Sequence, residues 1–211
     1  MSDVWTQSRF GNVIDLVEPT TYQVDLWEIC LTLASINRFG GHASPDVSVA
    51  FHSLIVADLV DHDHKGYALV HDFHEAYIGD ITTPVADALA ETAKQLWPHE
   101  PIRASMLVRD TIKELKGRHD YAIYTAAGLE CPTTLQKQVI READLRALVT
   151  ERRDFMAPKP QDWHPGIERI APAKRIYATG DFGSTPKRVA WRLMAECEKY
   201  LPVFRDSQRA A

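Results

Sequence analysis

Histidine and carboxylate side chains stand at positions where helical periodicity predicts a buried surface. His52 falls on an apolar stripe of its helix, so its ring is expected to point inward. His71 and Asp72 are adjacent in an apolar stretch, and Asp144 lies on or beside the predicted inner face of a later helix. Buried imidazoles and carboxylates are costly unless they are paired or bound to a metal, so these positions need an explanation.

A divalent metal ion is the explanation that these residue types favour. Imidazole nitrogen and carboxylate oxygen are ligands for zinc, manganese, iron or cobalt. A lone inward histidine is more often a hydrogen-bonded core residue, and a lone His-Asp dipeptide is close to uninformative. Four such residues on three helices, with Glu75 one turn after His71 and Asp80 after a glycine, are much harder to obtain by chance.

The composition and charge of the chain limit the functions it can have. Its 211 residues suit one domain or two small ones, and 45% apolar and 25% charged residues are ordinary for a folded protein. A net charge of −5 argues against a nucleic acid polymer as partner. The absence of an apolar leader or of a run of about 18 apolar residues argues against secretion and against a membrane partner. Three widely spaced cysteines predict a reducing, cytoplasmic setting.

Apolar spacing and turn residues predict an all-α protein. Residues 1–24 are expected to be irregular, and 157–183 to form a long loop with a short helix near 172–178. The chain is predicted to form a single domain over 1–211, with the loop and final helix of 157–201 packed on its core. Helices are expected over residues 25–36, 47–60, 67–78, 85–97, 102–127, 133–155 and, opened by Ser184, 184–201.

The order of the candidate ligands resembles the H…HD…D pattern of the HD-domain metal-dependent phosphohydrolases, which are helical bundles with a metal site between central helices. The resemblance covers about residues 25–155. The motif HDFHE at 71–75, with Arg38 upstream and Asp80 downstream, is similar to the bacterial 5′-deoxynucleotidase branch. The segments RFGGH, 38–42, and TERRD, 150–154, look more like related phage enzymes that remove triphosphate from dATP.

The resemblance implies a role for each of these residues. A single divalent ion, of cobalt, manganese, zinc, nickel, iron or magnesium, would lower the pKa of a bound water and shield phosphate charge. Glu75 would orient or deprotonate that water, Asp80 would give a proton to the leaving sugar oxygen, and Arg38 would bind the phosphate. The ligands implied for the metal are His52, His71, Asp72 and Asp144.

Structural roles remain open for the residues around the metal. Glu75 could instead fix one of the metal-binding histidines, Asp80 could end a helix, and Arg38 could form a surface salt bridge. His42, in a Gly-Gly-His turn near Arg38, could contact a substrate phosphate or simply lie in an exposed turn. His74 is expected to have a structural or supporting role.

Several functions therefore compete. The leading prediction is a phosphohydrolase that removes the 5′-phosphate of deoxynucleoside monophosphates. The alternatives are a deoxynucleoside triphosphate triphosphohydrolase and a non-catalytic module that binds a nucleotide; hydrolysis of a cyclic dinucleotide or of guanosine tetraphosphate is less favoured. Besides the nucleotide, the expected partner is a second copy of the chain in a homodimer, through apolar residues of the terminal helices: Trp191, Leu193 and Leu201.

Overall fold

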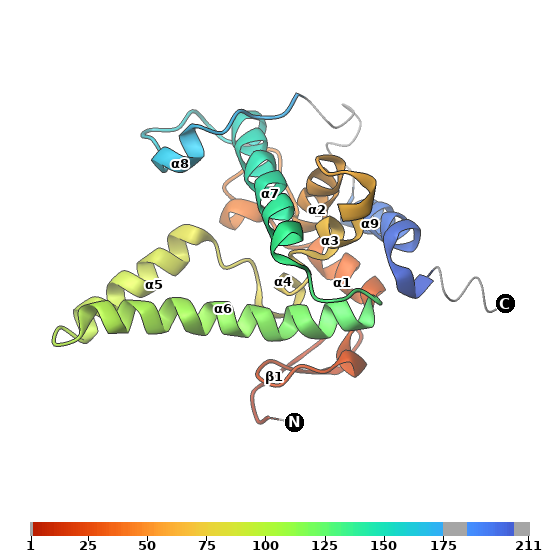
Figure 1. Ribbon diagram of the computed structural model, residues 1–211, viewed down its shortest axis with the longest axis horizontal. Helices are drawn as coiled ribbons and strands as arrows, with labels where there is room; N and C mark the ends of the chain where they lie inside the picture. The colour runs from red at the N-terminus through yellow and green to blue at the C-terminus, as the bar shows by residue number, and fades with distance from the viewer. Residues whose placement is uncertain (1, 175–184, 205–211) are drawn as a thin grey trace.

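Helices make up most of the protein (Figure 1). The computed structural model describes residues 2–174 and 185–204. Within these ranges strand is confined to a two-stranded sheet, so the all-α class predicted from the sequence is confirmed in its main feature. No helix in the described part of the chain has the length and apolar character to cross a membrane. The α-helices are α1 (Leu26–Leu33), α2 (Val49–Asp58), α3 (Lys65–Val70), α4 (Glu75–Ile78), α5 (Thr83–Leu96), α6 (Pro101–Ala126), α7 (Thr134–Phe155), α8 (Pro165–Glu168) and α9 (Pro186–Tyr200).

The N-terminal segment is more regular than its sequence predicts. Strands β1 (Trp5–Gln7) and β2 (Val13–Asp15) pair antiparallel, with Thr6 opposite Ile14. The prediction of irregular structure over 1–24 is therefore wrong for these residues. Three residues per strand are too few to produce a recognisable apolar and polar alternation, so periodicity gives no signal here.

Helix α2 forms the centre of the core. Ser48 caps its first turn by accepting a hydrogen bond from the backbone N–H of Phe51, and every side chain from Val49 to Ala57 is buried. Helices α1, α3, α7 and α9 all pack against it. A helix surrounded in this way needs apolar residues on all sides, and His52 stands out because its ring is fully buried among them.

The predicted helix over 67–78 is interrupted where the motif of 71–75 begins. Helix α3 ends at Val70 and α4 begins at Glu75. In between, the N–H groups of Phe73 and Glu75 donate to carbonyls three residues back, which is a tighter turn than an α-helix makes. Gly79, at φ +79°, then ends α4. The side chains of residues 71–75 are therefore not arranged as they would be on one continuous α-helix.

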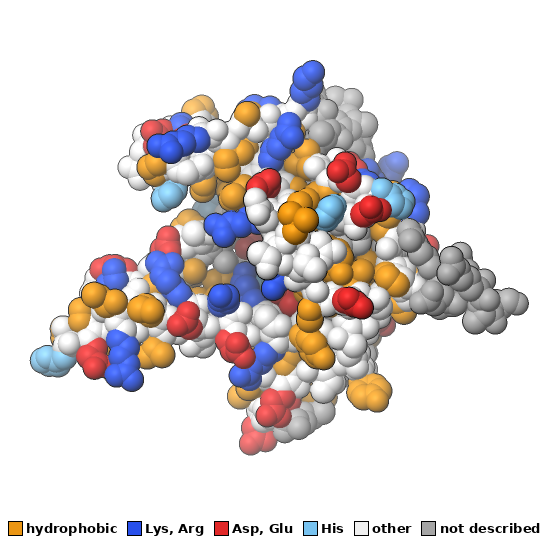
Figure 2. All heavy atoms as spheres, in the orientation of Figure 1, with side chains coloured by type: hydrophobic (Ala, Val, Ile, Leu, Met, Phe, Trp, Pro, Cys, Tyr) orange, Lys and Arg blue, Asp and Glu red, His pale blue; other side chains and the backbone are white. Residues whose placement is uncertain are grey.

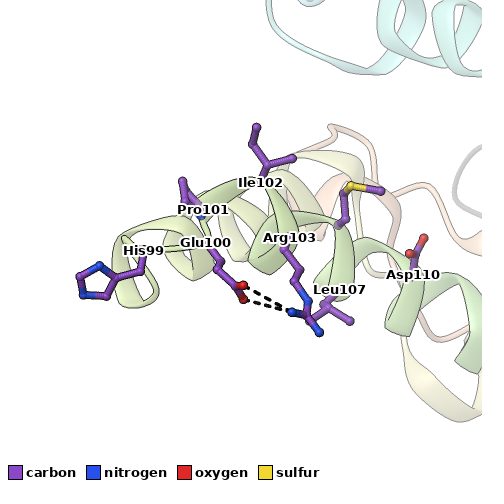
Figure 3. A pocket seen from close by; sticks show the side chains of 8 residues that line it. His99, Glu100, Pro101, Ile102, Arg103, Leu107 and Asp110 are labelled. Carbon is purple, nitrogen blue, oxygen red and sulfur yellow. Dashed lines mark hydrogen bonds and ion pairs between the residues drawn. The ribbon is translucent and has the colours of Figure 1, made fainter.

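Helices α5 and α6 form an arm that projects from the rest of the molecule (Figure 1). Their contact seam contains small buried side chains, including Ala90, Ala93 and Ala104. Larger side chains face outward, among them Ile102 and Met106 beside a shallow depression near the tip of the arm (Figure 3). The arm borders one side of a hollow that faces α7 (Figure 2).

The C-terminal helix α9 packs on α1, α2 and α3. Leu193 and Leu201 are fully buried in the core of this chain, so they are not available for the dimer contact predicted for them. Trp191 is 57% exposed and its ring lies 4.7 Å from that of Trp27. The homodimer itself stays a prediction. Ser184 and most of the short helix predicted near 172–178 lie outside the described residues.

Candidate metal centre

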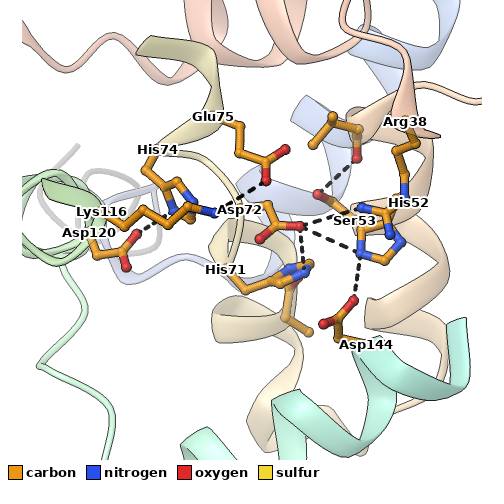
Figure 4. Close-up of polar contacts among 12 residues, drawn as sticks. Arg38, His52, Ser53, His71, Asp72, His74, Glu75, Lys116, Asp120 and Asp144 are labelled. Carbon is orange, nitrogen blue, oxygen red and sulfur yellow. Dashed lines mark hydrogen bonds and ion pairs between the residues drawn. The ribbon is translucent and has the colours of Figure 1, made fainter. Parts of the chain in front are cut away.

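Three separate elements bring four predicted ligands together (Figure 4). His52 comes from α2, His71 and Asp72 from the turn between α3 and α4, and Asp144 from α7. Each of His52, His71 and Asp72 offers a ligand atom within 4.8 Å of those of the other two. The Asp72 Oδ2 lies 3.0 Å from His71 Nε2 and 3.6 Å from His52 Nε2. Asp144 Oδ1 lies 3.1 Å from His52 Nε2.

Asp144 lies at the rim of this cluster rather than in the core. Its side chain is 37% exposed, although its position on the helix predicted a place on or beside the buried face. Together with His71 it lines a pocket of about 220 Å³. The cluster is therefore open to a ligand from the side of Asp144.

The hydrogen bonds of the two histidine rings fit a metal ion. Nδ1 of His52 is 2.9 Å from Glu151 Oε1, and Nδ1 of His71 is 2.8 Å from the carbonyl oxygen of Ala68. Both Nε2 atoms are buried and lack a well-formed hydrogen bond. When Nδ1 donates, Nε2 of a neutral ring carries a lone pair, and here it faces carboxylate oxygens that cannot donate to it. A divalent cation between the Nε2 atoms and the carboxylate oxygens would bind to both kinds of atom.

Electrostatics link the protonation states of these groups. Burial and the charge of Arg38 oppose protonation of His52, but Glu151 and Asp144 outweigh them and raise its pKa. Burial opposes protonation of His71 too, yet Asp72 raises its pKa to about 9. In the metal-free protein, His71 therefore holds a proton at neutral pH that a metal would displace.

Arg38 and Glu151 extend the cluster on its buried side. Arg38 begins a short 3-10 turn, η2 (Arg38–Gly41). Its Nε donates to Glu151 Oε2 at 3.1 Å, and its guanidinium lies 3.8 Å from Asp72 Oδ2. The Arg38 side chain is only 11% exposed. A surface salt bridge, the structural alternative for Arg38, is thus excluded by its burial.

Glu151 is the residue that sequence reasoning missed. It is fully buried and contacts both Arg38 and His52, whose charges lower its pKa against the effect of burial. A signal was available, because Glu151 follows Asp144 by seven residues and so lies on the same face of α7, with Ala147 between them. A carboxylate on that face, two turns from a candidate ligand, indicates a partner for the site.

Glu75 lies near Asp72, and the charges of Asp72 and Asp80 both act on it. Glu75 is buried, and its Oε1 is 3.9 Å from Nζ of Lys116. Burial and the nearby charges of Asp72 and Asp80 raise the pKa of Glu75 to about 9. Burial likewise raises the pKa of Asp80. Glu75 follows the turn that separates α3 from α4, and its ligand atom groups with those of Asp72 and His74.

The structure does not bring His42 to the centre. Its side chain is exposed directly after η2, and it takes part in none of the ion pairs of the cluster. The ring of His74, by contrast, is buried and bonded through Nδ1 to Asp120 Oδ1 at 2.8 Å.

A pocket beside the centre carries both aromatic and basic side chains. Tyr67 and Tyr124 form one part of its wall, with their ring centroids 6.1 Å apart. Lys137 and Arg141, one turn apart on α7, form another part. Figure 2 shows Lys and Arg side chains bordering the hollow between the α5–α6 arm and α7. This distribution gives a mildly acidic protein a local surface suited to an anion.

Comparison with known proteins places the chain in a family. No family model matches it. Over 150 residues it is 33% identical to the uncharacterized protein YfdR of Escherichia coli strain K12, an alignment that covers 71% of this chain and 70% of that protein. The chain belongs to the same family as YfdR. Over 100 residues it is also 33% identical to the uncharacterized protein RCAP_rcc00048 of Rhodobacter capsulatus, covering 43% of this chain and 51% of that protein. Because both relatives are uncharacterized, membership of the YfdR family assigns no activity to the centre.

Proposed function

We propose that this chain is an HD-type, metal-dependent phosphohydrolase of nucleotides. The favoured reaction is removal of the 5′-phosphate from deoxynucleoside monophosphates. One observation carries the proposal: the buried Nε2 atoms of His52 and His71 make no well-formed hydrogen bond, yet they lie 3.1 and 3.0 Å from carboxylate oxygens of Asp144 and Asp72. Such a donor set suits a divalent ion of the zinc, manganese, iron or cobalt type.

The cation would be held by those four side chains. When bound, it supplies a water of lowered pKa and neutralises phosphate charge. Arg38 lies beside Asp72 with its guanidinium fixed by Glu151, so it is prepared to bind a phosphate oxygen next to the cation. Holding Arg38 in place before substrate arrives reduces the entropy lost on binding.

Glu75 and Asp80 are suited to proton transfer. Burial is the main cause of the raised pKa of Glu75, and the negative charge of Asp72 adds to it. A positive ion next to Asp72 would offset that charge and so favour the ionised form of Glu75, which can take a proton from water. The pKa of Asp80 is raised by burial, which favours the protonated form needed to donate to a leaving sugar oxygen. The two carboxyl groups then take opposite roles in the reaction.

A second candidate reaction is release of triphosphate from a deoxynucleoside triphosphate. Lys137 and Arg141 favour it, because they line the pocket that His71 and Asp144 also line. A longer phosphate chain requires more positive charge than a monophosphate does. These two side chains are placed to supply it.

The test is a panel of deoxynucleoside mono-, di- and triphosphates, supplied with Mn²⁺, Co²⁺, Zn²⁺, Ni²⁺ or Mg²⁺, with chromatographic identification of the products. Orthophosphate from monophosphates supports the favoured reaction, and tripolyphosphate from triphosphates supports the second. The Asp144→Asn variant is the control, since it keeps the shape of the side chain but removes a ligand charge. Binding of nucleotides without release of any phosphate, with every metal, would instead favour a non-catalytic module.

A further inference from the structure

A third histidine beside the centre has the same arrangement as the two proposed ligands. His74 is buried, with a side chain 5% exposed. Its Nδ1 is 2.8 Å from Asp120 Oδ1, and its Nε2 is buried without a hydrogen-bond partner. A carboxylate that fixes one ring nitrogen while the other stays unpaired is the usual environment of a metal-binding histidine. The role of His74 as a purely structural residue leaves its Nε2 unexplained.

The residue after His74 has an unpartnered atom as well. Oε2 of Glu75 is buried and makes no hydrogen bond, while Oε1 faces Lys116 at 3.9 Å. Ligand atoms of Asp72, His74 and Glu75 all lie within 4.8 Å of one another. Figure 4 shows the His74 ring between Asp120 and the side of the cluster formed by Glu75 and Asp72. One ring nitrogen and two carboxylate groups thus lie close enough together to share a cation, and His74 and Glu75 are both buried.

We propose that Asp72, His74 and Glu75 bind a second divalent cation next to the first. The proposal rests on the proposed function in one respect, because Asp72 would serve both centres. The Oδ2 of Asp72 faces His52 and His71, which leaves its second oxygen for the other group. A mixed nitrogen and oxygen donor set favours manganese, zinc, iron or cobalt over calcium.

Lys116 sets the affinity of this second site. Its ammonium group is the closest positive charge to Glu75 and partly neutralises the cluster when no ion is bound. A cation must compete with that charge, which weakens its binding at the second site. Removing the charge of Lys116 is expected to strengthen binding at the second site and to leave the first nearly unchanged.

Two cations that share a carboxylate can contact one phosphate group from two sides. As a ligand of the second cation, Glu75 would orient the attacking water through that cation instead of taking its proton directly. The substrate class that fits such a pair is a phosphate ester with charge on several phosphate oxygens, which agrees with the nucleotide substrate proposed above. The number of metal ions bound per chain tests this inference independently of phosphohydrolase activity.

The experiment measures bound metal in the full-length chain. Metal-free protein is dialysed against Mn²⁺ up to millimolar concentration, and protein-bound manganese is counted by elemental analysis. The variants are His74→Phe, which keeps a ring but removes both nitrogens, Asp120→Asn, which removes the charge that orients the ring, and Lys116→Met. His119→Gln is the matched control, because His119 is also a fully buried histidine with an unpartnered ring nitrogen but lies outside both groups.

We expect about two equivalents of Mn²⁺ in the parent chain and about one in His74→Phe. Asp120→Asn should weaken the second equivalent by about 10- to 100-fold, and Lys116→Met should tighten it. About one equivalent in both the parent and His74→Phe would overturn the second site and leave the first intact. No bound metal in the parent would overturn both. A loss in His119→Gln equal to that in His74→Phe would also overturn the assignment, since it would reflect general damage.

Discussion

Replacing Glu151 with glutamine removes a negative charge that two positively polarised groups share inside the protein. Glu151 accepts from Arg38 Nε at 3.1 Å and lies 2.9 Å from His52 Nδ1, with no exposed surface. Glutamine has about the same shape, but its single oxygen can accept from one of these donors while its NH₂ group faces the other. The substitution therefore leaves a buried donor unpaired and the Arg38 charge less compensated.

Two magnitudes follow from this geometry. A charged hydrogen bond contributes about 1.5–3 kcal/mol, and breaking a buried ion pair costs about 3–5 kcal/mol. Arg38 keeps its contact with Asp72 at 3.8 Å, so we expect Glu151→Gln to lower the free energy of unfolding by about 2–4 kcal/mol. Because Glu151 orients the His52 ring, metal affinity should fall by about 10- to 100-fold.

Urea unfolding of the metal-free protein and calorimetric titration with Zn²⁺ or Mn²⁺ measure the two effects separately. Glu142→Gln is the control, because Glu142 is exposed on the same helix and accepts only from Gln138 at 3.0 Å among the bonds described. The control should stay within about 0.5 kcal/mol of the parent. If Glu151→Gln bound metal with parental affinity, Glu151 would have no positioning role at the centre.

Three further predictions concern the same centre. Asp144→Asn should lose first-site metal and activity together, as elemental analysis and phosphate release would show; a variant that kept the first-site metal at parental affinity would exclude Asp144 as a ligand. Arg38→Ala should raise KM for a nucleotide more than it lowers kcat, since Arg38 is expected to bind the phosphate, and an unchanged KM in steady-state kinetics would remove it from substrate binding. The pKa of His71 is raised to about 9 from its ordinary 6.5, so its stabilising contribution to the metal-free protein is complete below about pH 6.5 and is lost as the pH rises through about 9. Thermal unfolding in the presence of a chelator should show this loss of stability. Calorimetry in buffers of different ionisation enthalpy should show that metal binding at neutral pH releases a proton. Metal binding without proton release would contradict the raised pKa of His71.

The helices could be predicted from the sequence where local signals agree with packing. Thr133, the first residue of the helix expected over 133–155, closes a capping box with Gln136 at the start of α7. Asp25, the first residue of the helix expected over 25–36, caps α1 by accepting a hydrogen bond from the N–H of Glu28. The apolar surroundings of His52 also gave the correct inward direction, because α2 is buried on every side.

The break between α3 and α4 and the partners of His74 and Glu151 could not be predicted, because they depend on contacts between segments far apart in the sequence. The turn between α3 and α4 contains neither glycine nor proline, and its residues have helical backbone angles at His71 and His74. Local helix propensity therefore predicts no break between α3 and α4. The contacts of His74 with Asp120 on α6 and of Glu151 with Arg38 span 46 and 113 residues of sequence, and periodicity describes one helix at a time.

Diffraction data collected at the absorption edge of a bound metal test the central claim most directly. In crystals of the protein grown with Zn²⁺, the strongest anomalous peak should lie at about 2.0–2.2 Å from Nε2 of both His52 and His71 and from oxygens of Asp72 and Asp144. A strongest peak elsewhere, with the His52 and His71 rings hydrogen-bonded to the carboxylates and no ion between them, would contradict the metal centre and the phosphohydrolase proposed from it.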